Sequence, residues 1–208
     1  MKHTDDRFEH VARWLEVPID PDQRALLVAY EEWLGSEALD AGGIGPNEAG
    51  RLFDRHIVDS LAYLKGFPEE AATLLDVGGG VGLPAIPIAV ALPRLEVTMV
   101  DRSERRAALA RRAVRILGLR NVEVRVADVA EVPGRFDVTT FRASLRIEAA
   151  ALVTIERTGP GGVGLFCVSR RPEEPVVPSA PAGVTFSLSS EGLGVLDSPF
   201  WLLRMQRT

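Results

Sequence analysis

The sequence predicts an α/β protein in which a mostly parallel, seven-stranded sheet follows a helical N-terminal extension. Two observations support this prediction: apolar residues recur at helical spacing through the first third of the chain, and from residue 73 onward short apolar runs alternate with helical stretches. The 208 residues, of which 46% are hydrophobic, suffice for one core and a short extension. We therefore expect an extension over residues 1–66, packed on a core domain over residues 67–208.

The elements can be placed in chain order. Three helices are predicted over about residues 5–16, 22–39 and 46–65, and Pro46 suits the first position of the third helix. Strands are predicted over residues 73–77, 96–100, 122–127, 136–141 and 163–168, with helices over residues 83–91, 103–117 and 145–158. A Pro-rich segment, residues 171–183, follows them. Residues 184–188 and 200–205 are then expected to close the sheet as a hairpin.

Composition excludes several classes of protein. The chain has no apolar run long enough to cross a membrane and no apolar signal segment near Met1, so we expect a cytoplasmic protein without membrane contact. Its single cysteine, Cys167, rules out an internal disulfide and a Cys-rich zinc site, and we expect no metal. The sequence does not indicate an oligomeric state.

Charge is spread unevenly around a net value of −5. The first 50 residues are acidic, whereas arginines crowd the stretch from residue 102 to residue 125. These arginines are Arg102, Arg105, Arg106, Arg111, Arg112, Arg115, Arg120 and Arg125. Such a segment can bind phosphates or form the solvated face of a surface helix, and the sequence favours neither interpretation.

A glycine-rich turn follows the first predicted strand. Asp76 ends that strand, and Gly78, Gly80 and Gly82 follow it at alternate positions before a helix begins. Glycine allows the backbone to approach a ligand closely because it has no Cβ and adopts positive φ. Asp101 ends the second strand, where an acid in a doubly wound fold accepts hydrogen bonds from ribose hydroxyls. The pattern predicts a cofactor that carries a nucleoside.

Two cofactors fit this turn. Residues 80–85 match the G-x-G-x-x-A dinucleotide pattern, while residues 76–82 spell D-x-G-x-G-x-G, the pattern of Rossmann-like class I S-adenosylmethionine-dependent methyltransferases. The Asp76 carboxylate suits a cofactor with an amino cation and repels a pyrophosphate, which favours S-adenosylmethionine. Asp128, after the third strand, is then placed to bind the exocyclic amine of adenine, and Val129 lies against the ring.

Three segments resemble one family, the bacterial small-subunit rRNA guanine-N7 methyltransferases, historically the glucose-inhibited division protein B family. Residues 55–61 are close to R-H-I-x-D-S-L, residues 76–87 to D-x-G-[ST]-G-x-G-x-P-G-[IV]-P, and residues 136–143 to F-D-x-[IV]-x-[ST]-R-A. The resemblance implies a methyltransferase with rRNA or the small ribosomal subunit as its partner. It also implies that Arg55, His56 and Asp59 lie near the cofactor pocket and that Arg142 faces the RNA as the catalytic residue.

The chemistry of guanine N7 agrees with the residues found. N7 carries a free lone pair and needs no general base, so catalysis would come from in-line positioning and exclusion of water. No convincing acid and base pair occurs in the sequence, and the N-P-P-[FY] and Pro-Cys motifs of other nucleic-acid methyltransferases are absent.

The chain departs from the family pattern at four positions. Asp128 stands where the family usually has an Arg, Ser169 where it has a Lys, Phe141 where it has Ser or Thr, and Ala85 where it has Gly. The two lost cations leave other functions open: a methyltransferase for a small molecule or protein, or a non-catalytic relative that binds the cofactor.

Overall fold

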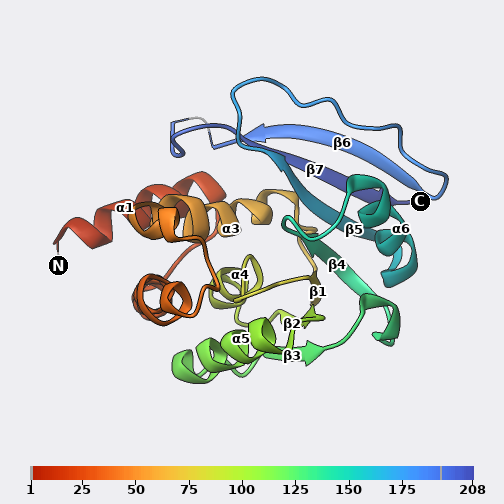
Figure 1. The fold of residues 1–208 in the computed structure, drawn as a ribbon. Coiled ribbons are helices and arrows are strands. Elements are labelled where there is room, and N and C mark those ends of the chain that lie inside the picture. Colours follow the sequence, from red (N-terminus) through yellow and green to blue (C-terminus); the bar gives the residue numbers. More distant parts are fainter. Residues whose placement is uncertain (1, 193) are drawn as a thin grey trace.

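A seven-stranded sheet forms the centre of the computed structural model, which describes residues 2–192 and 194–208. The strand order is β3-β2-β1-β4-β5-β7-β6 (Figure 1). β1 to β5 run parallel, whereas β7 is antiparallel to both of its neighbours. This confirms the predicted mostly parallel sheet and the closing hairpin. Met1 and Leu193, which belong to the predicted ranges 1–66 and 67–208, lie outside the described residues.

The helices and strands follow the predicted order. The helices are α1 (Lys2–Leu15), α2 (Pro21–Trp33), α3 (Asp59–Ala62), α4 (Ala85–Ala91), α5 (Glu104–Leu117) and α6 (Ile147–Arg157). The strands are β1 (Thr73–Val77), β2 (Glu96–Asp101), β3 (Val122–Val126), β4 (Phe136–Phe141), β5 (Thr158–Ser169), β6 (Val184–Glu191) and β7 (Phe200–Arg207). Shorter 3₁₀ or π turns occupy Leu34–Ala38, Pro46–Arg51, Phe53–Val58, Tyr63–Gly66 and Val129–Glu131.

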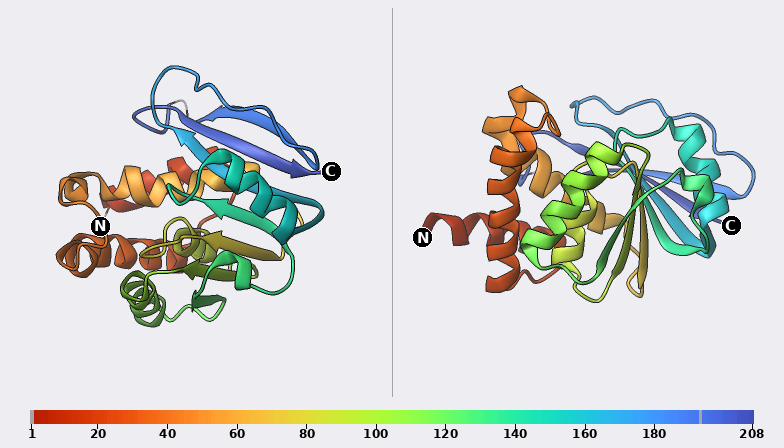
Figure 2. Two further views of the ribbon diagram at one scale, coloured as in Figure 1. Left: turned by 45° about the vertical axis from the view of Figure 1, so that its right-hand side comes forward. Right: turned by 60° about the horizontal axis from the view of Figure 1, so that its bottom comes forward.

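Helices cover both faces of the sheet (Figure 2). Alternate residues of the strands point to opposite faces, so Leu74 joins a core that includes α2 and α4, while Leu75 joins a second core with α6. Both leucines are fully buried. Burial on both faces explains why the inner strands read as continuous apolar runs.

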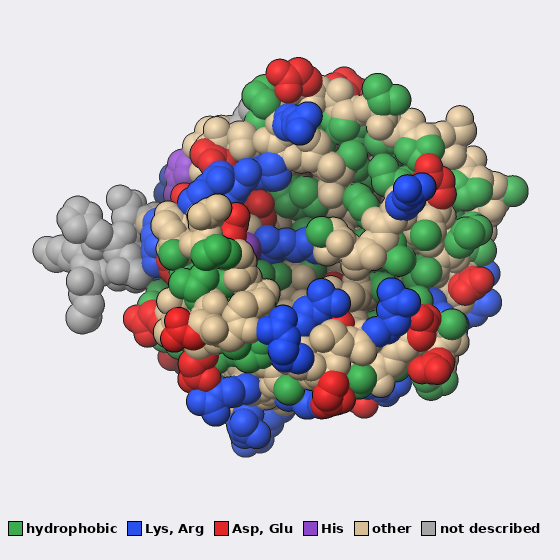
Figure 3. Space-filling model, in the orientation of Figure 1, with side chains coloured by type: hydrophobic (Ala, Val, Ile, Leu, Met, Phe, Trp, Pro, Cys, Tyr) green, Lys and Arg blue, Asp and Glu red, His purple; other side chains and the backbone are tan. Residues whose placement is uncertain are grey.

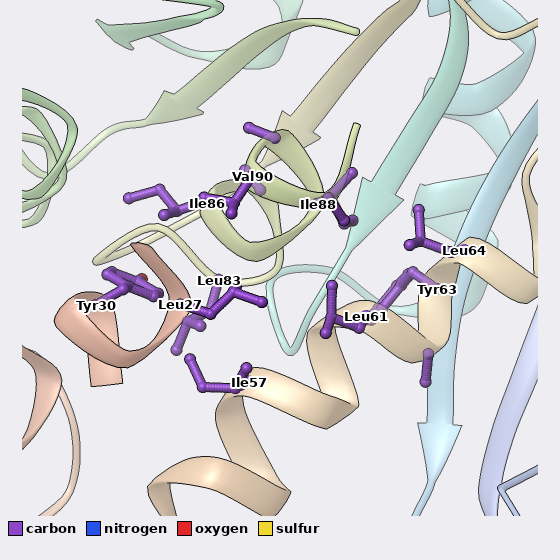
Figure 4. Close-up of a cluster of buried hydrophobic side chains, with 14 of the residues drawn as sticks. Leu27, Tyr30, Ile57, Leu61, Tyr63, Leu64, Leu83, Ile86, Ile88 and Val90 are labelled. Atoms are coloured by element: carbon purple, nitrogen blue, oxygen red, sulfur yellow. The ribbon is translucent and has the colours of Figure 1, made fainter. Parts of the chain in front are cut away.

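The helical extension is part of the larger core. Figure 4 shows buried side chains of α2, α4 and the segment around α3 packed together, among them Leu27, Ile57 and Ile86. Two polar contacts also tie α2 to the core domain. The Tyr30 hydroxyl donates to the Val81 carbonyl at 3.2 Å, and the Gln23 amide donates to the last carbonyls of α4 at 3.0 and 3.1 Å. α2 therefore holds the glycine-rich turn in place through contacts at Val81, within the turn, and at the end of α4, the helix that follows it.

Sheet register brings the predicted site residues to one edge. Asp76 in β1 is level with Met99 in β2 and with Thr140 in β4. The turns that follow these strands therefore meet at the carboxyl edge of the sheet, where ligands bind in open α/β folds.

The prediction of one regular helix over residues 46–65 is wrong. The segment starts at Pro46 as expected but runs as a 3₁₀ turn, a π turn, the short α3 and a second 3₁₀ turn. Gly50 weakens the helix, and the Asp59 N–H bonds the Asp54 carbonyl five residues back, which widens the turn. The predicted helix over residues 22–39 likewise ends at Trp33 and continues as a π turn.

The start of β5 also differs from the prediction, by five residues. The helix expected to reach residue 158 ends at Arg157, and Thr158 already pairs with Phe136 of β4. The Gly159-Pro160 pair that follows cannot continue a helix, because Pro160 restricts the residue before it to extended conformations. No helix in the described part of the chain is long and apolar enough to cross a membrane.

Candidate functional site

A cavity of about 420 Å³ lies at the carboxyl edge of the sheet. Of the residues singled out from the sequence, Gly78, Asp101, Asp128, Val129 and Arg142 line it. The others do not line it: Asp76, Gly80 and Gly82 belong to the strand end and the glycine turn, and Arg55, His56 and Asp59 to the neighbouring helical segment. Figure 3 shows Arg and Lys side chains around a hollowed part of this face of the molecule.

The glycines of the turn serve different contacts. Gly78 adopts φ +74°, and a Cβ there would lie 2.5 Å from the Ser144 Cβ, so this glycine allows the turn after β4 to approach. Gly80 adopts φ +58°, and a Cβ there would meet no atom closer than the Gly78 carbonyl oxygen at 4.0 Å, so the space on that side of its backbone is open. Gly82 makes room for the side chains of Ile86 and Tyr30. Gly82 is therefore a packing residue, whereas Gly78 and Gly80 shape the site.

Asp101 organises the centre of the site. Its carboxylate is 5% exposed and accepts hydrogen bonds from the Gly80 N–H at 3.1 Å and the Ser103 N–H at 2.8 Å. The Arg106 guanidinium lies 3.2 Å from the same carboxylate. These donors hold the carboxylate at the cavity wall, with accepting capacity left for a ligand.

Asp128 and Val129 lie at the outer end of the cavity. The Asp128 side chain caps the short 3₁₀ turn, accepting from the Ala130 N–H at 3.0 Å, and its other oxygen lies 3.7 Å from Arg102. It is 44% exposed. Asp128 thus both caps the 3₁₀ turn and lines the cavity. Its carboxylate would have to accept from an adenine amine in addition to the Ala130 N–H.

Asp76 is fully buried beneath the glycine turn. Its Oδ1 accepts a 2.8 Å hydrogen bond from the Thr140 hydroxyl, while its Oδ2 has no hydrogen-bond partner. A Cβ on Gly79 would collide with that free oxygen. Burial raises the pKa of Asp76 to about 7, against the opposing effects of Thr140 and Arg142. The free oxygen makes Asp76 a built-in acceptor for a donor that reaches the turn.

Arg142 links the cavity to the helical segment. Its guanidinium donates to the Arg55 carbonyl and to the His56 Nδ1, both at 2.9 Å, and to the Ser60 hydroxyl at 3.4 Å. The next residue, Ala143, holds φ at +52°, an uncommon conformation for a residue with a side chain. This tight turn brings Arg142 and Ser144 to the same cavity.

His56 is buried and neutral beside Arg142. Burial lowers its pKa to about 4, and the nearby charge of Arg142 adds to the effect. Because a guanidinium can only donate, the His56 Nδ1 must accept, which puts the ring proton on Nε2, 3.4 Å from a Glu48 carboxylate oxygen. His56 therefore positions Arg142 and is not a proton carrier near neutral pH.

Asp59 pairs with a residue that the sequence analysis passed over. Its Oδ2 lies 3.3 Å from the Arg170 Nε, and its Oδ1 has no hydrogen-bond partner. Burial raises the pKa of Asp59 to about 6 although Arg170 opposes the rise. The sequence shows Ser169 in place of the family's Lys, and the signal that could have revealed Arg170 is the cation at the very next position.

Most arginines of the basic segment form contacts with other residues of this chain. Arg106 pairs with Asp101, Arg111 with Glu104 at 3.1 Å, and Arg125 with Glu123 at 2.7 Å. Arg112 on α5 also forms an ion pair with Glu37 of the helical extension. These pairs favour the solvated helix face over the phosphate-binding surface.

Comparison with known proteins points in one direction. A family profile described as rRNA small subunit methyltransferase G matches residues 23–178. Ribosomal RNA small subunit methyltransferase G of Acidothermus cellulolyticus is 38% identical over 138 residues, which cover 66% of this chain and 62% of the relative. The protein of the same name from Salinispora arenicola is 32% identical over 200 residues, covering 89% and 82%. This chain thus spans less than two thirds of the Acidothermus protein.

Solved structures agree on the fold. The crystal structure of a SAM-dependent methyltransferase from Aquifex aeolicus matches with a TM-score of 0.55 and 18% identity, covering 79% of this chain and all of that one. At this identity the likeness concerns the fold alone. It confirms the predicted class I methyltransferase fold.

Proposed function

Because the chain belongs to the rRNA small subunit methyltransferase G family, we propose that it transfers a methyl group from S-adenosylmethionine to guanine N7 of small-subunit rRNA. The observation that carries the proposal is that Gly78, Asp101 and Arg142 line one and the same cavity. One wall of that cavity is suited to the cofactor and the other to the acceptor. An rRNA acceptor would make the cytoplasm the place of the reaction.

The residues present fit S-adenosylmethionine better than a dinucleotide. Asp101 and Asp128 at the cavity wall would meet a ribose and an adenine amine, whereas a pyrophosphate would face both carboxylates. The unpartnered Oδ2 of Asp76 suits the amino cation, reached through water or the turn backbone. The open space above Gly80 leaves the backbone accessible.

The protein's part in the reaction is to position the cofactor and the guanine and to exclude water. The cofactor supplies an electrophilic methyl group, and guanine N7 supplies the lone pair, so no side chain needs to remove a proton. Arg142 would orient the guanine or its phosphate with its planar set of donors, and His56 holds that guanidinium in place. Effective positioning of this kind accounts for a large share of the rate in transfer reactions.

A labelling experiment tests the function. The purified protein is incubated with methyl-labelled S-adenosylmethionine and a lysate of its source organism that lacks this gene, and RNA, protein and small molecules are then separated. Label in small-subunit rRNA, recovered as 7-methylguanosine after nuclease digestion, is the expected result. Label in the protein or small-molecule fraction would contradict the proposed acceptor. Bound cofactor without any label would make the chain a non-catalytic relative.

A further inference from the structure

Three arginines surround one carboxylate beside the site, two from the helical segment over residues 46–66 and one that follows β5. Asp197, in the turn between β6 and β7, lies 2.9 Å from Arg170, 3.4 Å from Arg51 and 3.7 Å from Arg55. The guanidinium of Arg170 also donates to the Ser198 carbonyl, and that of Arg55 to the Ser198 hydroxyl at 3.4 Å. We call Arg51, Arg55 and Arg170 the arginine cluster.

The arginine cluster carries more positive charge than its partners neutralise. Its three cations face two carboxylates, Asp197 and Asp59, and Asp59 is a buried partner of Arg170 alone. The Arg170 side chain is 11% exposed, with its Nε 3.3 Å from Asp59 and its Nη2 2.9 Å from Asp197. A buried guanidinium is costly unless anions complete its contacts, and Asp197 is shared among all three arginines.

The arginine cluster is accessible to a ligand and adjoins the acceptor side of the cavity. Arg55 and Arg170 line a hollow of about 800 Å³, together with Ser169 and Arg171 and with two acids, Glu173 and Glu174. The Arg55 carbonyl accepts from Arg142, which lines the cofactor cavity. In Figure 3, Arg and Lys side chains are intermixed with Asp and Glu side chains around the hollowed part of this face.

The position of Asp197 resembles that of a bound anion. Its side chain is 49% exposed, so solvent and ligands reach it, and both of its oxygens face guanidinium groups. Planar guanidinium groups bind carboxylates and phosphates with the same donor geometry. A phosphate carries more accepting oxygens and a higher charge density than one carboxylate, and it can therefore replace Asp197 among the same donors.

We propose that the arginine cluster binds a backbone phosphate of the acceptor RNA and that Asp197 occupies this phosphate site in the free protein. This inference rests on the proposed function, because it concerns the same acceptor. Arg170 then takes the role of the cation missing at Ser169, supplied one residue later. Asp197 weakens binding of every RNA and makes the protein selective for acceptors that offer enough other contacts.

The test measures RNA binding without methyl transfer. The probe is a short, fluorescein-labelled single-stranded RNA of mixed sequence, titrated with full-length protein while anisotropy is recorded. Asp197→Asn is expected to tighten binding by about threefold to tenfold at low salt and to steepen the salt dependence. Glu69→Gln is the matched control, because it removes one exposed negative charge in the turn before β1, away from the arginine cluster.

A double variant identifies the cations responsible. Arg51 is half-exposed and has no buried partner, so Arg51→Gln should fold normally, and adding it to Asp197→Asn should cancel the gain. Equal binding by Asp197→Asn and Glu69→Gln would overturn the proposal, as would a gain that persists in the double variant. An equal gain for polyglutamate would also overturn it, since the site would then not select phosphate. A failed methylation assay leaves this binding result intact, so the two proposals fail separately.

Discussion

Two regions of the site are built in different ways: the cofactor side of the cavity, and the acceptor side, which comprises Arg142 at the cavity wall and the adjoining residues Asp59 and Arg170. On the cofactor side, Asp101 is surrounded by donors from the adjacent turns, the N–H groups of Gly80 and Ser103 and the side chain of Arg106. On the acceptor side, Arg142 and Arg170 contact a helical segment that is distant in sequence. Each side also holds a buried carboxylate oxygen without a hydrogen-bond partner, the Asp76 Oδ2 on the cofactor side and the Asp59 Oδ1 on the acceptor side.

This difference indicates which side is fixed by local contacts. The Asp101 carboxylate is held by donors from adjacent turns and keeps accepting capacity for a ligand, so this part of the cofactor side is preorganised. On the acceptor side, the positions of Arg142 and Arg170 depend on contacts with a segment distant in sequence, and Arg170 opposes the buried charge of Asp59. We therefore expect substitutions on the cofactor side to reduce the affinity for S-adenosylmethionine. Substitutions on the acceptor side are expected to change turnover, RNA affinity and the pH dependence of stability.

The largest effect is expected at Asp101. Asp101→Ala removes the acceptor of two backbone N–H groups and of the proposed ribose contact, and should weaken S-adenosylmethionine binding about 100-fold, measured by calorimetry. Asp128→Ala is the comparison within the same half, because Asp128 is 44% exposed and should cost less than about tenfold. Equal losses at the two positions would contradict the central role of Asp101.

Asp76 should make cofactor binding dependent on pH. Its carboxyl has a pKa raised to about 7 and is neutral below that pH in the free protein, whereas a cationic cofactor favours the ionised form. Affinity should therefore rise with pH by up to about tenfold per unit and level off above pH 7. Asp76→Asn keeps the shape and cannot ionise, so its weaker affinity should be flat with pH. A parallel slope in this variant would rule Asp76 out as the cause.

Arg170 should govern how stability depends on pH. Asp59 has a folded pKa raised to about 6, so its contribution favours the folded state at low pH and is lost as pH rises through 6. Arg170→Gln removes the opposing cation and should lower the free energy of unfolding by about 1–3 kcal/mol at pH 8, with a smaller loss at pH 5. Urea titrations at both pH values measure this. An equal loss of unfolding free energy at both pH values would show that Arg170 does not affect the pKa of Asp59.

The smallest effect is expected on the surface of α5. Arg112 and Glu37 form an ion pair whose side chains are 48% and 42% exposed, so Arg112→Gln should leave the melting temperature nearly unchanged and RNA affinity within about twofold of wild type. Anisotropy titration with the labelled RNA measures the second quantity. A loss comparable to that of an arginine-cluster variant would return the phosphate-binding role to the basic segment.

The cofactor half could be predicted because its signals are local. The strand over residues 73–77 has the predicted bounds, and the acids at strand ends and the glycine spacing follow directly from the chain. Parallel strands bring their carboxyl ends to one edge, so Asp101, Asp128 and Val129 reach one cavity by topology alone. For Arg106 the sequence leaves open a phosphate-binding role or a solvated helix face, and no sequence pattern predicts its ion pair with Asp101.

The acceptor half could be predicted only in part, because long-range contacts build it. The motif around Arg55 identified the segment, but not the π turn that places His56 beside Arg142. Asp197 lies in a hairpin turn without any motif, and its role depends on arginines from two segments that are distant in sequence, residues 46–66 and the end of β5. Helical periodicity predicts a regular helix, and the segment over residues 46–66 is irregular where it contacts the site.

The most direct test of this division of labour is Arg142→Ala, assayed for cofactor affinity and methyl transfer in the same preparation. Calorimetry should give a dissociation constant for S-adenosylmethionine within about twofold of wild type, while transfer to small-subunit rRNA falls by about a hundredfold or more. Arg142→Lys keeps the charge without the planar donors and should recover only part of the rate. Unchanged turnover in Arg142→Ala, or cofactor affinity and turnover that fall together, would contradict the account.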